Sequence, residues 1–285
     1  MRTVSLLEVR DKIKDLVQEA NFALPDDVAA CLRDMETREE SPEGQEVFAQ
    51  LRQNAAIARD EQIALCQDTG LAVFFVEIGE DVHLAREADL KSLSQAINEG
   101  TRLGYSEGYL RKSVTADPLR RTNTGDNTPA FIHWELKPGD HLRITFMAKG
   151  AGAENWSTIR MFRPTAALEE IEAFVVEAVD KAGASACPPL IVGIGIGGNF
   201  EFSALLAKQA LLRTPLGLPN PDPFYAGLEK RLLARINRLG LGPQGLGGRI
   251  TALAVHVESR SCHIASLPVA INIECPVHRV RSFEL

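Results

Sequence analysis

The chain has 285 residues, of which 45% are hydrophobic and 24% charged, and its formal net charge is −7. These proportions exclude global disorder and fit one or two globular domains, and the acidic balance argues against a general nucleic-acid binder, which carries a basic stripe. No apolar run approaches the roughly 20 residues that cross a membrane, and the start of the chain lacks the apolar core of a signal peptide. We therefore expect a cytoplasmic protein that binds neither membranes nor nucleic acid.

The first 65 residues are predicted to be helical. Residues 4–22 place apolar side chains on one stripe at a spacing of three to four residues, which is the period of an amphipathic helix. A second helix is expected to begin at Pro25 and end near Arg38. A third helix is expected to begin at residues 41–43 and to continue to about Ala64. Ser41 suits the N-cap position, and Pro42 and Glu43 suit the first two helical positions.

The sequence becomes mixed helix and strand after residue 70. The elements expected up to residue 148 are, in chain order, an apolar strand at 71–78, a helix at 84–103, a long polar loop at 104–129, and two strands at 129–135 and 141–148 that pair through a turn. Loops as long as 104–129 are usually functional or mobile. Elements expected after it are helices at 164–183, 200–213 and 225–239, and strands at 189–194, 250–257 and 267–273.

This order predicts an α/β fold in which a helical N-terminal region packs on a mixed β-sheet domain with surrounding helices. No linker or internal repeat interrupts the chain. We therefore expect a single domain over residues 1–285, helical to residue 65 and mixed α/β from residue 66.

A glycine-rich motif at residues 193–198 matches GxGxxG between a strand and a helix, which is typical of a dinucleotide site. The strand that such a site needs next would fall at residues 214–222, which are too rich in proline for a central strand. An NAD-dependent oxidoreductase is therefore the weaker functional alternative. The start of the helix after the motif could bind a carboxylate as well as a pyrophosphate, because its N–H groups and dipole favour any anion. Further glycine loops at 149–153 and 240–248 let the backbone approach a ligand closely.

The five cysteines, Cys31, Cys66, Cys187, Cys262 and Cys275, are odd in number, widely spaced and form no CxxC pair. A secreted disulfide framework is therefore improbable, which leaves buried thiols and metal ligands. The strongest local signal is Cys66-Gln67-Asp68-Thr69-Gly70, where a thiol, an amide, a carboxylate and a hydroxyl meet at a helix-to-strand junction. Cys187 precedes a predicted strand and Cys275 closes the last one, so these three thiols can converge.

Four segments carry a resemblance to a known family, and they read CQDTGLAVFFVEIG, GYLRKSVTADPLRRTNTGDNTP, ACPPLIVGIGIGG and GLGPQGLGG. Together they closely resemble the α-type subunit of class I, iron–sulfur-dependent fumarate hydratase, and the related L(+)-tartrate dehydratase α subunit shares much of the pattern. The resemblance extends from about residue 10 to about residue 278. It implies that Cys66, Cys187 and Cys275 hold a [4Fe–4S] cluster whose fourth iron is left to substrate or water.

The resemblance also implies an active site. Gln67 and Asp68 belong to it, with Asp68 the nearest candidate for proton transfer, although the catalytic base can also lie on a partner chain. His263 matches a histidine that contacts a substrate carboxylate, and the alternative for it is a hydrogen-bonded histidine at a strand edge. His256, within an apolar strand, is predicted to be structural, and Cys31 and Cys262 are predicted to be thiols outside the site.

Hydration of a dicarboxylate alkene develops negative charge on a carboxylate, which a bound cation stabilises, and an open iron position acts as a Lewis acid. The second carboxylate needs an arginine or backbone N–H groups. We expect Arg111, in the polar loop, to bind that carboxylate, with Gly150 and Gly152 in close backbone contact with the substrate.

The predicted activity is the reversible hydration of fumarate to (S)-malate, with L(+)-tartrate dehydration as the alternative substrate reaction and a non-catalytic iron–sulfur binding or assembly protein as a further possibility. Single-chain family members carry a second, β-type region, whereas this chain ends ten residues after Cys275. We therefore expect a separate β-type subunit and a higher αβ oligomer that acts on a small dicarboxylate.

Overall fold

The structure, a computed structural model, describes residues 2–87 and 89–285 and confirms a mixed α/β fold. The chain divides into two compact units with interleaved segments. Unit 1 consists of Met1–Pro25, Asn54–Ala151 and Arg279–Leu285, and unit 2 consists of Asp26–Gln53 and Gly152–His278. The prediction of one domain over the whole chain remains a prediction.

The predicted N-terminal helices are present as α1 (Leu6–Phe22), α2 (Asp26–Arg38) and α3 (Pro42–Glu61). A short strand, β1 (Arg2–Ser5), precedes them, and Ser5 caps α1 by accepting a hydrogen bond from the Glu8 amide. Among the described residues, no helix combines the length and the apolar character needed to cross a membrane.

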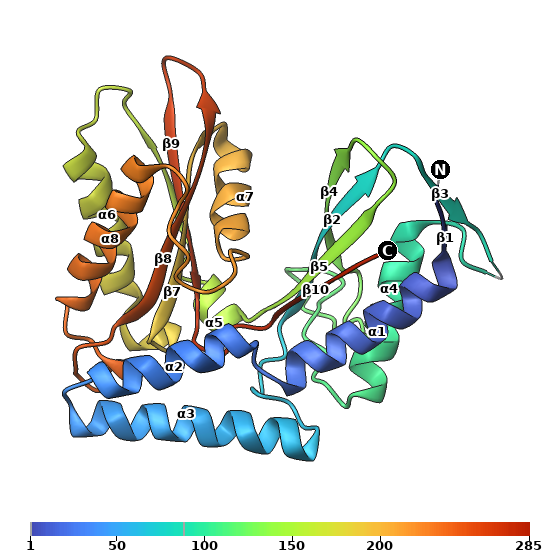
Figure 1. The fold of residues 1–285 in the computed structure, drawn as a ribbon, viewed down its shortest axis with the longest axis horizontal. Helices are drawn as coiled ribbons and strands as arrows, with labels where there is room; N and C mark the ends of the chain where they lie inside the picture. The colour runs from blue at the N-terminus through green and yellow to red at the C-terminus, as the bar shows by residue number, and fades with distance from the viewer. Residues whose placement is uncertain (1, 88) are drawn as a thin grey trace. The chain divides into compact units, whose positions relative to one another are not determined.

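Unit 1 contains a four-stranded sheet and a two-stranded one. Its remaining elements are β2 (Leu71–Gly79), β3 (Val82–Ala85), α4 (Leu93–Glu107), β4 (Phe131–Lys137), β5 (Leu142–Lys149) and β10 (Val280–Glu284). The strand order is β10-β5-β2-β4, and β1 pairs with β3 in parallel. Figure 1 shows α1 and α4 beside each other in this unit, and both contribute apolar side chains to its core.

Two sequence predictions in unit 1 are wrong. The strands β4 and β5 do not pair with each other, because β2 lies between them and is parallel to β4 and antiparallel to β5. The run from Ala72 to Val76 is buried, which suits a central strand, whereas much of β4 is exposed, which suits an edge. The helix expected at 84–103 begins only at Leu93, after the cap Ser92, because Val82–Ala85 pairs with β1.

Unit 2 is built on a second four-stranded sheet. Its elements are β6 (Thr158–Phe162), α6 (Leu168–Ala182), β7 (Leu190–Gly198), α7 (Phe200–Ala210), α8 (Pro223–Asn237), β8 (Ala252–Cys262) and β9 (Leu267–Glu274), with the short helix α5 (Ala151–Glu154) at its boundary. The order is β6-β9-β7-β8, with β7 parallel to β8 and antiparallel to β9. Figure 1 shows α6 and α8 beside each other and α7 on the other side of the sheet.

The glycine motif at 193–198 is part of β7 and not a loop, which corrects the sequence prediction that the strand ends at Ile194. A Cβ added at Gly193 would lie 2.1 Å from the Ala207 carbonyl oxygen, and one at Gly195 would lie 2.0 Å from the Ser203 carbonyl oxygen. The glycines therefore allow α7 to pack directly on β7. Close helix packing, and not phosphate binding, explains this motif, which weakens the oxidoreductase alternative.

Candidate functional site

The carboxylate of Asp68 is fixed by backbone N–H groups in unit 1. Asp68 Oδ2 accepts a hydrogen bond of 2.8 Å from the Ala151 amide, and Oδ1 accepts one of 3.1 Å from the Gly70 amide. Gly150 is buried beside this carboxylate, and a Cβ added there would lie 3.2 Å from Asp68 Oδ2. Asp68 and Gly150, which the sequence predicts as site residues, therefore lie in direct proximity, and the exposed Gly152 follows two residues later.

Arg111 and Gln67 complete this corner of unit 1. The Arg111 Nη1 atom donates a hydrogen bond of 3.0 Å to Gln67 Oε1, and the Thr69 hydroxyl donates one of 2.7 Å to the Arg111 carbonyl. Both the Arg111 and Gln67 residues are exposed. The polar loop thus brings a solvent-accessible guanidinium to the turn that carries Asp68, where it can bind an anion.

A second basic residue at this corner, Arg279, was missed by sequence reasoning. Its side chain is only 2% exposed, and Nη1 donates to the Asp68 carbonyl at 2.7 Å and to Asn21 Oδ1 at 3.2 Å. Its Nη2 would lie 3.5 Å from a Cβ added at Gly150, and its buried Nε has no hydrogen-bond partner among the described residues. The only sequence signal was an arginine four residues after Cys275.

The carbonyl groups of the turn at 66–70 are further held by buried side chains. The Tyr105 hydroxyl donates to the Thr69 carbonyl at 2.8 Å, and Asn127 Nδ2 donates to the Gly70 carbonyl at 3.2 Å. Burial raises the pKa of Tyr105, so its hydroxyl keeps the proton that it donates. The turn is therefore pre-organised by side chains that come from α4 and from the polar loop.

In unit 2, the sheet brings Cys187 and Cys275 to the same end of two neighbouring strands. Ile191 near the start of β7 is paired with Glu274 at the end of β9, so Cys275 follows directly and Cys187 lies just before β7. Cys187 is exposed and has a left-handed backbone with φ 57°. The Cys275 Sγ contacts the Val277 carbonyl at 3.9 Å.

The donor chemistry of the predicted cluster ligands fits an iron–sulfur cluster. None of the five cysteines forms a disulfide within the part of the chain that the structure describes. Thiolates are the ligands that hold iron–sulfur clusters, and Cys187 and Cys275 present theirs from adjacent strand ends, while Cys66 belongs to unit 1. Within residues 2–87 and 89–285, no three or more His, Cys, Asp or Glu side chains form a metal-binding group.

His263 lies at the opposite end of the sheet from these two cysteines. The register pairs Leu190 with Ala252 and Gly198 with Cys262, so the strands separate the two ends by eight residue steps, or about 26 Å. The exposed His263 accepts a hydrogen bond of 3.1 Å from the Ala265 amide at its Nδ1 atom. Within unit 2, the structure therefore does not bring His263 to Cys187 and Cys275, and its contacts are those of a strand-edge histidine.

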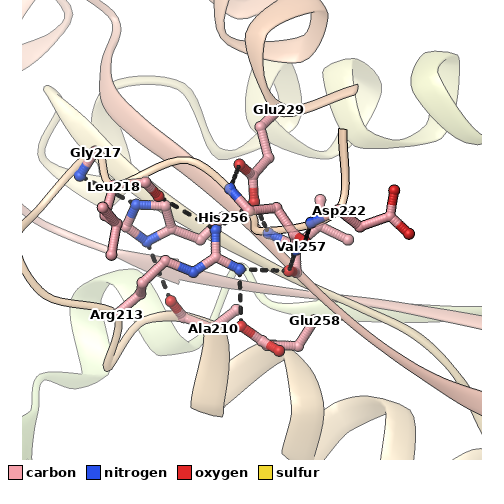
Figure 2. Close-up of polar contacts among 10 residues, drawn as sticks. Ala210, Arg213, Gly217, Leu218, Asp222, Glu229, His256, Val257 and Glu258 are labelled. Atoms are coloured by element: carbon pink, nitrogen blue, oxygen red, sulfur yellow. Dashed lines mark hydrogen bonds and ion pairs between the residues drawn. The ribbon is translucent and has the colours of Figure 1, made fainter. Parts of the chain in front are cut away.

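The buried His256 is structural, as the sequence predicts. Its Nδ1 bonds the Ala210 carbonyl at 3.1 Å, and its Nε2 accepts from the Gly217 amide at 3.1 Å, as Figure 2 shows. Burial, with the positive charge of Arg213 as a second cause, lowers the pKa of His256 to about 4, so the ring is neutral at pH 7. This arrangement fixes the proline-rich connector at residues 214–222 to β8.

Arg213 provides the charged part of the same network. Figure 2 shows its guanidinium between Glu229, at 2.5 Å, and Glu258, at 2.7 Å. Asn220 also donates to the Val257 carbonyl at 2.7 Å. These contacts join the connector to α8 and β8, so the network has a structural role.

The two remaining cysteines have surroundings unlike those of ligands. Burial, together with Asp34 and Asp27, raises the pKa of Cys31 to about 11, so its thiol is protonated at neutral pH. Cys262 is exposed, and its Sγ donates to the Ser266 carbonyl at 3.3 Å.

Comparison with known proteins decides the family. The family described as "Fumarate hydratase (Fumerase)" matches residues 10–284. The chain belongs to this family. The resemblance seen in the sequence is thereby confirmed, and a member of the fumarate hydratase family is a hydro-lyase subunit.

Three similar proteins are named as α subunits. The chain is 40% identical over 275 residues to "Putative L(+)-tartrate dehydratase subunit alpha" of Methanocaldococcus jannaschii, covering 94% of each chain. It is 34% identical over 279 residues to "L(+)-tartrate dehydratase subunit alpha" of Escherichia coli strain UTI89, covering 94% of this chain and 89% of the relative. The same subunit of strain K12 is 33% identical over 279 residues with the same coverage.

Proposed function

We propose that the chain is the α subunit of an iron–sulfur hydro-lyase that hydrates fumarate reversibly to (S)-malate. The observation that carries this proposal is the corner of unit 1 where the turn at 66–70 holds Asp68 against the Ala151 amide and is joined to Arg111 through Gln67 and Thr69. Family membership supports the reaction class. The names of the relatives favour L(+)-tartrate as the alternative substrate of the same site.

Cys66, Cys187 and Cys275 are proposed to hold a [4Fe–4S] cluster, as the resemblance implies. When bound, the cluster would supply a Lewis-acid position for the substrate's hydroxyl and carboxylate oxygens, because three thiolates leave one iron without a protein ligand. None of the three forms a disulfide within the described part of the chain.

The chain's own residues would bind and orient the dicarboxylate. Arg111 is proposed to bind one carboxylate, and the backbone at Gly150 and Gly152 to contact the substrate closely. Asp68, oriented by the N–H groups of Gly70 and Ala151, is proposed to move or direct a proton, with Gln67 beside it. The hydrogen bonds to Asp68 fix its direction before substrate arrives, so little reorganisation is needed.

The rest of the assembly is also a proposal. Relatives named as α subunits support a β-type partner for this chain, which would supply further substrate-binding groups and can supply the catalytic base. We propose that residues 1–285 act as one catalytic domain in a higher αβ oligomer. A reducing cytoplasm suits a cluster that has an open iron.

A comparison of two substrates and one variant tests this function. The chain is reconstituted anaerobically with iron, sulfide and a β-type subunit, and the turnover of fumarate and L(+)-tartrate is assayed. In Asp68→Asn we expect the cluster absorbance to persist while kcat falls by about 10²- to 10⁴-fold, the range for a lost proton-transfer group. Turnover of tartrate alone would overturn the choice of fumarate, and an unchanged kcat in the variant would overturn the role of Asp68.

A further inference from the structure

We propose that Glu39 is a positioning residue for Cys187, acting through the glycine loop at 240–248. This inference rests on the proposed function, because it takes Cys187 as a ligand of the cluster. Glu39, Cys187 and the loop all belong to unit 2. The sequence pattern predicts that the glycines of this loop let the backbone approach a ligand. In the structure, the carboxylate of Glu39 lies against Gly248 of the loop.

The carboxylate of Glu39 is enclosed by four backbone N–H groups. Its Oε1 accepts from the amides of Glu40 at 2.8 Å, Ser41 at 2.9 Å and Arg249 at 2.8 Å. Its Oε2 accepts from the amides of Arg249 at 3.0 Å and Ile250 at 2.7 Å. The residue is 2% exposed, and burial alone would raise its pKa, but these N–H groups outweigh burial and lower it. A buried carboxylate of this kind is an internal anion that holds two remote segments together.

The backbone around Glu39 is shaped to admit it. A Cβ added at Gly248, where φ is +133°, would lie 2.7 Å from Glu39 Oε1. A Cβ added at Gly44 would lie 2.7 Å from Glu39 Cγ. A larger residue at Gly44 or Gly248 would displace the Glu39 side chain, so its position depends on both glycines.

The same loop reaches the turn that carries Cys187. The Gln244 amide donates a hydrogen bond of 2.7 Å to the Pro188 carbonyl, and its side-chain Nε2 donates a second one of 3.1 Å to the same oxygen. Gly245 packs directly on Ala184, because a Cβ added there would lie 2.4 Å from the Ala184 Cβ. The Cys187 amide donates to the Ala184 carbonyl at 3.0 Å. The loop thus contacts the Cys187 turn on both of its sides.

Both residues at this contact have an unusual backbone. Cys187 has φ 57° and Gln244 has φ 54°, which is the left-handed region that residues other than glycine rarely adopt. Such conformations persist only where the surrounding structure enforces them. We infer that the bonds from Gln244, held in turn by Glu39, keep the Cys187 thiol in the direction from which it binds iron. Loss of Glu39 would let Cys187 relax to an ordinary conformation and would turn its sulfur away.

The first experiment measures how well the cluster is held. Glu39→Gln and Gln244→Asn are reconstituted anaerobically with the β-type subunit, and iron and sulfide per chain are measured, as is the rate of absorbance loss in EDTA. Asparagine tolerates the left-handed backbone but is too short to reach Pro188. We expect cluster retention to weaken by about 10- to 100-fold in both variants, as for other residues that support a metal ligand.

The matched control is Glu172→Gln. Glu172 is also buried in unit 2, at 7% exposure, but its carboxylate pairs with Arg231 and Arg235. We expect this variant to hold the cluster like the unaltered chain. Equal cluster loss in Glu39→Gln and Glu172→Gln would overturn the proposal, because it would indicate general weakening of unit 2.

A second readout does not depend on the cluster. In the apo chain, iodoacetamide labelling of Cys187 is followed by mass spectrometry, with the exposed Cys262 as the internal reference. Glu39→Gln and Gln244→Asn should change the rate at Cys187 severalfold and leave Cys262 unchanged. If neither the Cys187 rate nor cluster retention changes, the positioning role is wrong. If the rate changes but Cys187→Ser keeps a full cluster, the positioning role stands and the ligand role of Cys187 fails.

Discussion

The two corners of this chain that bear predicted site residues are held by buried charges of opposite sign. In unit 1 the guanidinium of Arg279 donates to the carbonyl of the Asp68 turn. In unit 2 the carboxylate of Glu39 accepts hydrogen bonds from the amides of Arg249 and Ile250, which directly follow the glycine loop at 240–248. Both charges bind backbone and not an opposite side chain. They differ in how fully they are used: Glu39 is bonded through both oxygens, whereas Arg279 keeps a buried Nε without a partner among the described residues. Both oxygens of Glu39 therefore hold backbone in place, whereas the described residues leave part of the hydrogen-bonding capacity of Arg279 unused.

The largest effect is expected from Arg279→Met. Two acceptors, the Asp68 carbonyl and Asn21 Oδ1, lose their donor in a buried place, and each unpaired group costs about 1–3 kcal/mol. We expect the free energy of unfolding to fall by about 3–5 kcal/mol and kcat/KM to fall with it. Urea denaturation measures the first, with Arg59→Met as control, because Arg59 and its ion-pair partner Asp60 are both exposed and should matter little. Similar losses in both variants would contradict a special role for Arg279.

Glu39→Gln should cost less, about 2–3 kcal/mol, and should change the pH dependence of stability. Because the pKa of Glu39 is lowered by folding, its contribution is present above its ordinary pKa, near 4.5, and is lost as the pH falls through the lower folded value. Urea denaturation between pH 3 and pH 7 should therefore show a flatter profile for the variant. The control is Glu40→Gln, because Glu40 is the exposed neighbour of Glu39. If this variant also flattens the pH dependence of stability, the effect is not specific to the buried Glu39.

His256 provides a second test of pH-dependent stability, and the sign is the same as for Glu39. Folding lowers its pKa from 6.5 to about 4, so the stability that it contributes is present above pH 6.5 and is lost as the pH falls toward 4. The loss should reach about 2 kcal/mol at pH 5. An NMR titration of the ring should give an apparent pKa near 4, and a value near 6.5 would contradict the buried neutral ring.

The smallest effect on the cluster is expected from His263→Asn. Strand β8 separates His263 from the sheet end that bears Cys187 and Cys275. Iron content after reconstitution should therefore match that of the unaltered chain, even where the KM for substrate rises. A loss of iron as large as that in Cys187→Ser would show that the sheet register misplaces this histidine.

The sequence predicts well what depends on neighbouring residues. The patterns of the three N-terminal helices and the apolar strand at residues 71–78 are local, and all of them appear in the structure. The resemblance predicts Gln67 as a site residue, carboxylate chemistry predicts Arg111 in the polar loop, and the structure brings the two into hydrogen-bond contact.

Partners that are remote in the sequence could not be predicted in this way. Glu39 bonds an amide 210 residues away, and Arg279 bonds a carbonyl 211 residues away. In the sequence, Glu39 stands beside Glu40 like any surface acid. The place of β2 between β4 and β5 is likewise decided by a strand that precedes both of them in the chain. The apolar β2 is buried between them, and the turn that joins β4 to β5 does not reveal this. For the same reason, a motif match for His263 did not reveal at which end of the sheet it lies.

The interleaving of the two units has a consequence for how the protein is made. Unit 1 needs Arg279–Leu285, whose strand β10 pairs with β5 and whose first residue holds the Asp68 turn. A ribosome therefore has to translate past residue 284 before the residues that surround Asp68 can assemble, although Asp68 itself emerged more than two hundred codons earlier. Insertion of iron and sulfide into the proposed site would accordingly come after residues 279–284 have been translated.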